Sequence, residues 1–217
     1  MPDWNELAAR AEARYRDGEA RLPDDEPDAR QRQLTRMGNA AYAAGLARLM
    51  VGEDPSEWLN RAADRYRESY AEAPPGSWGR PIATIKARLL AGDWAGAEKA
   101  ARWALAEGAA EAESPIGRYA GTLAALTLGE VERARTLADS IRTRDDFPRD
   151  VGDALAMLAA DDVVGYAEQV EAVLESFESR EEYLEDMPVA DTVLVLQKLA
   201  ARRGMAAELS SQLLPSP

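Results

Sequence analysis

The chain contains no cysteine and no histidine among its 217 residues. The absence of cysteine excludes disulfides, thiolate metal sites and a cysteine nucleophile. The absence of histidine removes the commonest general base and the usual ligand of transition metals. An enzyme built from this chain would therefore have to use carboxylates, lysine, tyrosine, serine or arginine.

Lysine is almost as scarce. Of the 26 basic residues only Lys86, Lys99 and Lys198 are lysines, and with 39 acidic residues the net charge is −13. Few lysines, many acids and abundant alanine are typical of a salt-accumulating halophile or another high-GC organism. The acidic balance argues against nucleic acid as a partner, because binding to phosphates depends on clustered lysine and arginine.

Long apolar runs are also missing. No run approaches the roughly 18 residues that a membrane-spanning helix needs. The N-terminal sequence MPDWNELAAR has neither the basic lead nor the apolar core of a signal peptide. We therefore expect a cytoplasmic protein that does not enter a membrane, and a chain of this length suits one domain with a sizeable core.

The stretch around which the chain is organised runs from residue 183 to residue 204, YLEDMPVADTVLVLQKLAARRG. Pro188 can open a helix there, because the first turn has no use for its missing N–H, and Gly204 can close it in a left-handed cap. Apolar residues cover most of the circumference of this helix, which predicts burial on several sides. Several β-branched residues leave a buried strand as the alternative. Helix is preferred, because nothing else in the chain alternates with period two.

Helical signals recur along the rest of the chain. Asp3 can cap a first helix, an acidic loop covers residues 22–28, and a second helix spans residues 29–51, where small residues allow a neighbour to approach closely. Further helices are expected to start at Pro55, Ser114-Pro115, Pro148 and Asp161 or Asp162. Turns between helices are predicted at positions 32 to 43 residues apart, namely Gly52, Gly92, Gly129, Asp161 and Gly204.

This spacing is typical of stacked helical hairpins, in which each unit buries its apolar face on the next. We predict an all-α fold of about ten helices, an irregular stack of antiparallel helical hairpins similar to a tetratricopeptide bundle. The whole chain, 1–217, is expected to form a single helical domain. It would consist of an N-terminal hairpin (1–54), a helical-repeat body (55–205) and a frayed tail (206–217).

Two groups of carboxylates resemble metal-binding motifs. Asp24-Asp-Glu-Pro-Asp28 matches a magnesium-binding pattern of isoprenoid synthases, but its proline places it in a loop, and a solvated acidic loop is the better interpretation. Four further acids resemble the paired motif of all-helical nucleotide pyrophosphohydrolases, in which carboxylates on one helix face hold magnesium: Glu168, Glu171, Glu182 and Asp186. A solvated acidic face is again favoured, so neither a metal nor another cofactor is predicted.

The five tryptophans all lie before residue 104, and helix-spaced aromatic residues are more often core than surface. Trp78 is the exception. In Ser77-Trp-Gly-Arg-Pro81 it stands beside Arg80 in a segment that enters a helix, and neither residue belongs to a periodic apolar stripe. Because tryptophan and arginine dominate binding hot spots, these two residues are candidates for contact with a partner.

Four strings together resemble the immunity protein 49 family of bacterial polymorphic toxin systems. They are SWGRP (77–81), ARLLAGD (87–93), ESPIGRY (113–119) and YLEDMPVADTVLVL (183–196). The resemblance covers roughly residues 65–205. It implies an all-α antitoxin that binds and neutralises a partner toxin. Arg118 and Tyr119, in the third string, join the candidate partner-binding residues.

The fourth string contributes Asp186 and Asp191. They could receive Arg80 or Arg118 in a shared polar site, or favour the N-terminus of the helix that follows, and the structural role is preferred. The function that we expect is a non-enzymatic protein-binding module resembling an immunity protein. The alternatives are a general helical-repeat scaffold and, less favoured, a magnesium-dependent pyrophosphohydrolase.

Overall fold

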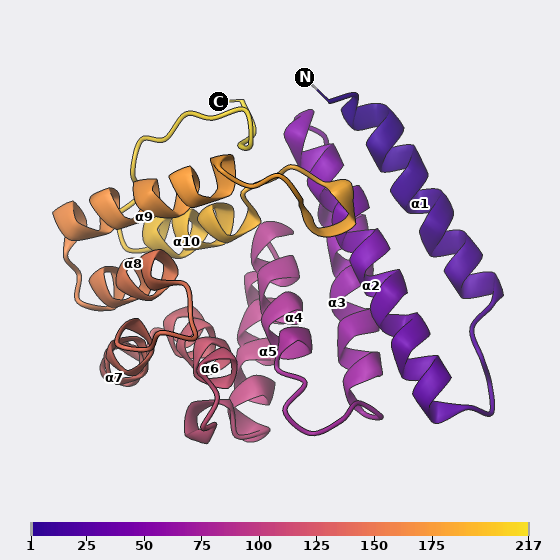
Figure 1. The fold of residues 1–217 in the computed structure, drawn as a ribbon, viewed down its shortest axis with the longest axis horizontal. Coiled ribbons are helices and arrows are strands. Elements are labelled where there is room, and N and C mark those ends of the chain that lie inside the picture. Colours follow the sequence, from indigo (N-terminus) through magenta and orange to yellow (C-terminus); the bar gives the residue numbers. More distant parts are fainter. Residues whose placement is uncertain (1, 217) are drawn as a thin grey trace. The chain divides into compact units, whose positions relative to one another are not determined.

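The computed structural model describes residues 2–216 (Figure 1). Over that range it contains ten α-helices, two short 3-10 helices and no strand, which confirms the predicted all-α class with about ten helices. The helices are α1 (Trp4–Ala20), α2 (Pro27–Met50), α3 (Ser56–Tyr70), α4 (Gly79–Leu90), α5 (Trp94–Ala106), η1 (Ala109–Glu111), α6 (Pro115–Leu128), α7 (Val131–Arg142), α8 (Arg149–Ala159), α9 (Val163–Glu178), η2 (Leu184–Asp186) and α10 (Asp191–Ala201).

The described chain divides into two compact units. Unit 1 comprises residues 2–94, Glu182–Val189 and residues 212–216, and unit 2 comprises Ala95–Glu181 and Ala190–Ser211. In unit 1, α1 packs on α2, α2 on α3 and α3 on α4, so consecutive helices lie side by side (Figure 1). In unit 2, α6, α7, α8 and α9 pack in the same consecutive way, and α10 lies against α8 and α9. The division expected at residue 54 falls between α2 and α3, which pack on each other.

Several helices begin where the sequence predicts. Asp3, Ser114 and Asp162 each accept a hydrogen bond from the backbone N–H three residues later, at 2.9–3.2 Å, and so satisfy a donor that the first turn leaves free. α2 begins at Pro27, two residues before the predicted start, because proline at the first helical position loses no hydrogen bond. The acidic loop is correspondingly shorter than expected.

All five predicted turns have the same backbone conformation. Gly52, Gly92, Gly129, Asp161 and Gly204 all have φ between 57° and 75°, in the left-handed region. In each turn the next residue's N–H bonds to the carbonyl oxygen five residues earlier, at 2.9–3.1 Å. This arrangement is the Schellman motif, which satisfies carbonyl groups that the end of a helix leaves free.

In unit 1 an arginine reinforces each of the two Schellman turns, at Gly52 and at Gly92. At the α2–α3 turn, Arg48 bonds to buried Glu12 of α1 and to Glu53 just past the turn. At the end of α4, Arg88 bonds to Asn60 and Asp64 of α3 and to Asp93 past the turn. Each guanidinium therefore ties its own turn to a neighbouring helix, and we call Arg48 and Arg88 the turn clamps.

Small residues bring α2 and α3 together, as predicted. A Cβ atom at Gly45 would lie 2.6 Å from Cγ of Leu59, and one at Gly38 would lie 2.8 Å from the ring of Tyr66. Both distances are too short for real contacts, so the helices could not approach this closely with alanine at either position.

The helix predicted to start at Pro188 starts instead at Asp191. Met187, Val189 and Ala190 are buried in a non-helical segment before it, so tertiary packing overrides the local signal of the proline. The remainder of the prediction is confirmed. α10 is a helix and not a strand, it buries Val193, Val195, Leu196, Leu199 and Ala200, and Gly204 closes it in the left-handed conformation.

Residues 205–211, expected to belong to a frayed tail, are tied to unit 2. The side-chain amide of Gln197 donates to the carbonyl oxygen of Ala207 at 2.5 Å, and its oxygen accepts from the Ala207 N–H at 3.1 Å and from the hydroxyl of buried Tyr166 at 2.9 Å. Ser211 donates to Glu178 of α9 at 2.6 Å. The final residue of the predicted tail lies outside the described residues.

Candidate functional site

The six predicted partner-binding residues divide equally between the two units. In unit 1, Trp78 is the half-buried N-cap of α4. The guanidinium of Arg80 donates to Oγ of Ser69 at 3.0 Å and to Oε1 of Gln31, so it joins α4 to α3 and α2. Desolvation lowers the pKa of the Arg80 guanidinium. Both of its acceptors are buried, and this geometry is that of a polar group that holds three helices together.

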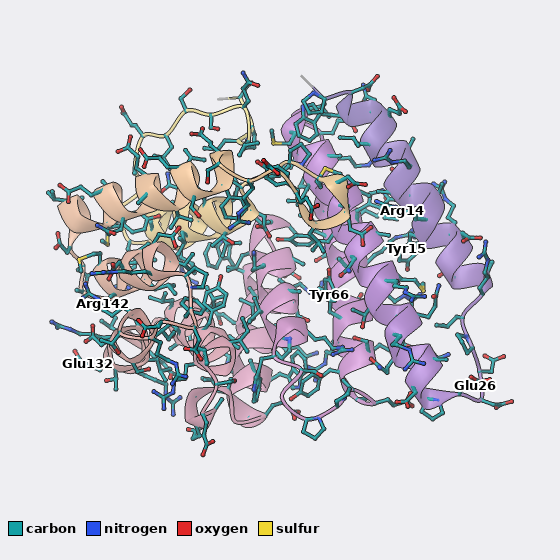
Figure 2. The ribbon with its side chains drawn as sticks, viewed as in Figure 1. Arg14, Tyr15, Glu26, Tyr66, Glu132 and Arg142 are labelled. Carbon is teal, nitrogen blue, oxygen red and sulfur yellow. The ribbon has the colours of Figure 1, made fainter. Side chains whose placement is uncertain are left out.

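Asp186 lies in η2 and not in the first turn of α10. Its charge is therefore not placed to stabilise the N-terminus of α10. Asp186 and Glu185 both have φ of 57°, which is strained for residues with a Cβ atom. Their carboxylates face α1, where Glu185 pairs with Arg14 at 2.9 Å and Asp186 pairs with Arg10 at 3.9 Å (Figure 2 labels Arg14). The partners of these acids are thus arginines of α1, and not Arg80 or Arg118, which the less favoured alternative named.

The other three predicted residues belong to unit 2. Arg118 is half-buried and donates from Nε to the carbonyl oxygen of Ala112 at 3.0 Å. Tyr119 is only 7% exposed, and its ring packs on that of Phe147 with centroids 5.4 Å apart. Asp191 is the half-buried first residue of α10. Tyr119 therefore belongs to the core of unit 2 and not to a surface that a partner reaches.

The carboxylates of the pyrophosphohydrolase motif are not arranged as that motif requires. Glu168 and Glu171 lie on α9, but Glu182 precedes η2 in a segment without α-helix, so Glu182 and Asp186 do not share a helix face. The part of the chain that the structure describes contains no group of three or more acidic residues positioned to hold a metal ion. The loop containing Asp24 and Asp25 is exposed.

Three of the Schellman turns gather at one edge of unit 2. Arg203, in the last turn after α10, donates from Nε and Nη2 to Oδ1 of Asp161 at 3.0 and 2.6 Å. The same arginine lines a cleft together with Gly129. The α6–α7 turn, the α8–α9 turn and the end of α10 are thereby brought together, and we call this region the unit 2 turn edge.

The cleft at the unit 2 turn edge has a volume of about 280 Å³. Its walls are mainly aliphatic, and two cations stand on the α10 side. The lining residues are Leu126, Thr127, Leu128, Gly129, Val131, Leu199, Arg202 and Arg203. An apolar recess rimmed by arginines can receive an aliphatic or aromatic side chain and a neighbouring carboxylate, which is the chemistry of a protein-binding hot spot.

Two exposed valines follow shortly after Asp161 in the chain. Val163 is 53% exposed and Val164 is 70% exposed, and both belong to the first turn of α9. The side chain of Asp162 caps that turn through the N–H of Gly165. A capped first turn holds the two valines in fixed positions at the surface, so their ordering costs little entropy when a partner binds.

Sequence reasoning missed this edge. The apolar stripe of α9 continues from Val170 through Tyr166 back to Val163 at helical spacing, so periodicity predicts burial of Val163. In the structure Tyr166 is buried but Val163 is 53% exposed, so the buried stripe of α9 ends within its first turn. The pair Val163-Val164 directly after two aspartates was the available signal, since helix starts at a surface usually carry polar residues.

No family model, curated protein or solved structure matches the chain. Within residues 2–216 no helix is both long and apolar enough to cross a membrane.

Proposed function

We propose that the chain is a non-enzymatic protein-binding module, resembling an immunity protein that binds and neutralises a partner toxin, and that the unit 2 turn edge holds the partner. The observation that supports the proposal is the combination of exposed Val163 and Val164 with the arginine-rimmed cleft. Val164 is 70% exposed and Val163 is 53% exposed, so a large part of both side chains is accessible. A partner that covers them gains the free energy of apolar burial.

Apolar contact also suits the charge of the chain. At −13 the protein attracts a basic partner at low ionic strength, but molar salt reduces the screening length to about 3 Å and removes long-range attraction. Contacts that a partner makes with the valine side chains do not depend on that attraction. Binding at the proposed edge is therefore compatible with a salt-accumulating cell, the kind of host of which the composition is typical. Trp78, Arg118 and Asp191 remain predicted partner contacts. Mutation of each residue would measure its contribution to partner binding.

Binding to a purified toxin domain, if one is encoded by a neighbouring gene, tests the proposal. Val164→Asp should weaken the affinity at least about tenfold, mainly through faster dissociation, because it places a charge in a dry contact. Val51→Asp is the matched control, because Val51 is also an exposed valine at a helix turn, 41% exposed, but belongs to unit 1. Equal affinity of the two variants, measured by surface plasmon resonance, would remove the unit 2 turn edge from consideration.

A photo-crosslinking residue at position 164, compared with the same residue at position 51, tests the edge in cells whose toxin has not been identified. We expect one protein to be captured from position 164 only. If the captured protein is not a toxin, and if co-expressing this chain with it does not restore the growth of the host cells, the immunity interpretation fails. The chain is then a general helical-repeat scaffold.

A further inference from the structure

The segment that follows α10 lies on unit 2 as an extended chain. From Met205 to Ser211 it forms no helix, and Figure 1 draws it in yellow beyond α10. Its burial alternates from one residue to the next. The residues at odd positions are buried or half-buried, and those at even positions are exposed, namely Ala206, Glu208 and Ser210. A period of two is that of an extended strand, whose successive side chains point to opposite sides. Every second residue of the segment therefore faces unit 2.

The side chain of Gln197, on α10, binds the backbone of this segment. Its Oε1 accepts from the N–H of Ala207 at 3.1 Å, and its Nε2 donates to the carbonyl oxygen of the same residue at 2.5 Å. An antiparallel strand exchanges the same pair of bonds with the residue opposite it. Because both bonds go to the backbone, the amide of Gln197 can hold any extended residue that has an N–H group, which excludes only proline.

Buried Tyr166 of α9 fixes the orientation of this amide. Its hydroxyl donates to Oε1 of Gln197 at 2.9 Å. Burial raises the pKa of Tyr166, so the hydroxyl keeps its proton and remains a donor. The bond identifies Oε1 as the acceptor atom and directs the amide N–H groups of Gln197 toward the segment. An amide that is oriented in advance loses little entropy when it binds an extended chain.

Both ends of the segment are anchored on unit 2. Met205 is 3% exposed and follows the left-handed turn at Gly204, and Ser211 donates to Glu178, the last residue of α9, at 2.6 Å. An extended chain between these two anchors spans about 20 Å. We call the surface beneath it, marked by Tyr166, Glu178 and Gln197, the tail seat. It accommodates alternate side chains in the order large apolar, small, aliphatic and hydroxyl-bearing.

We propose that the tail seat is a peptide-binding site, that the C-terminal segment is its ligand in cis, and that an extended segment of a partner protein with the same order of alternate side chains displaces it. In this mode of recognition backbone bonds give affinity and alternate side chains give specificity. A tethered segment competes at an effective concentration of about 1 mM, so the tail excludes partner segments that fit the seat less well. The site does not depend on the unit 2 turn edge, and either one can exist without the other.

Fluorescence anisotropy of a labelled synthetic peptide with the sequence of residues 205–216 tests the seat on the full chain. Ala207→Pro in the protein removes the N–H that Gln197 binds and weakens the tail in cis, so the peptide should bind this variant with a Kd of about 0.1 mM or below. The unaltered protein should bind it about tenfold more weakly, because its own tail competes. Glu208→Pro is the matched control. It changes the next, exposed residue, and peptide binding should stay as weak as in the unaltered protein.

A second substitution tests the role of Gln197. Gln197→Glu retains an oxygen that accepts from Tyr166 but loses the donor to the carbonyl of Ala207. Added to Ala207→Pro, it should weaken peptide binding about tenfold. In the peptide, Met205→Asp should weaken binding by at least as much, whereas Ala206→Asp should leave the Kd unchanged because that side chain points away from the seat. Circular dichroism of each protein variant checks that the fold is retained.

Three results would overturn the proposal. Equal binding of the peptide to the unaltered protein and to Ala207→Pro would show that the tail does not occupy a peptide site. Equal effects of Met205→Asp and Ala206→Asp in the peptide would show that alternate side chains are not recognised. Light scattering that finds dimers of Ala207→Pro or of the unaltered protein at the assay concentration would identify the tail of a second copy, and not a partner protein, as the occupant.

Discussion

The two units end their helices with the same backbone turn but treat the side chains around it differently. In unit 1 the residue that supplies the distal carbonyl of the Schellman motif is an arginine, Arg48 or Arg88, and its guanidinium clamps the turn to a neighbouring helix. In unit 2 the same position is occupied by Ala125, Met157 or Ala200. The guanidinium at the turns of unit 2 is that of Arg203, which lies past α10 and bonds to Asp161 of another turn. Val163 and Val164 after that turn are 53% and 70% exposed, whereas Val51 at the clamped α2–α3 turn of unit 1 is 41% exposed.

This difference teaches that a repeated backbone motif does not imply a repeated surface. Val163 and Val164 at a turn of unit 2 are more exposed than Val51 at a turn of unit 1, and a cleft lies at the unit 2 turn edge, and that is why the partner-binding proposal concerns unit 2.

Loss of a turn clamp should give the largest effect on stability. Arg48→Gln leaves the carboxylate of Glu12 buried with only the exposed Arg16 as partner, and we expect a loss of about 2 kcal/mol in the free energy of unfolding. Urea denaturation measures it. Arg133→Gln, which removes an exposed ion pair with Glu130 beside a turn of unit 2, should cost less than about 0.5 kcal/mol.

The double variant Glu12→Gln, Arg48→Gln should recover much of that loss, because two neutral amides replace an uncompensated charge. Equal costs for Arg48→Gln and Arg133→Gln would break the comparison, since they would show that the clamps of unit 1 are no stronger than surface pairs.

Alanine at the turn glycines should give an intermediate effect that is the same in both units. A Cβ atom at Gly92 or at Gly129 meets nothing within 4 Å, so only the left-handed backbone opposes the substitution, by about 1 kcal/mol in each case. Thermal unfolding of Gly92→Ala and Gly129→Ala checks this equality. A much smaller cost for Gly92→Ala would mean that the turn of unit 1 is held by its clamp and not by its backbone.

Much of the fold is predictable from the sequence because its signals are local. Glycine at the left-handed turns and Asp3, Ser114 and Asp162 at helix starts act within a few residues, so the turns and most helix starts are predicted correctly. The sequence also indicates a turn without glycine at Asp161, but it does not reveal the bond of that aspartate to Arg203, 42 residues away.

The failures involve groups distant in sequence. Pro188 is a sound helix-opening signal, but burial of Met187 and Val189 keeps the chain extended past it. The clamp between Arg48 and Glu12 joins residues 36 apart, which no periodicity reveals. The residue type of Tyr119 suggests a binding surface, yet its ring packs on Phe147 from a later loop. Whether such a residue is buried depends on how far a neighbouring helix covers it. A single sequence does not show that coverage.

The smallest predicted effect concerns the exposed pair of Arg144 and Asp146. The two hydrogen bonds from Arg144 lower the pKa of the Asp146 carboxyl, so the stability that this pair contributes is present above the ordinary aspartate value and is lost as pH falls through the lowered pKa. Carboxyl-carbon NMR titration should show this low pKa, and Arg144→Gln should return it to the ordinary range of about 3.9. A value that does not respond to Arg144→Gln would show that this guanidinium is not fixed by Asp146.

The division of the chain has a consequence for its synthesis. Unit 1 is discontinuous in sequence, because Glu182–Val189 belongs to it although unit 2 supplies the residues on either side. On a ribosome, α1 to α4 emerge first and can pack on one another, but η2, whose acids pair with Arg10 and Arg14 of α1, follows about 90 residues later, on the order of 5 to 20 s at ordinary rates of elongation. During that interval Arg10 and Arg14 of α1 lack these two carboxylates, so this part of unit 1 is completed only after Ala95–Glu181 of unit 2 has been made.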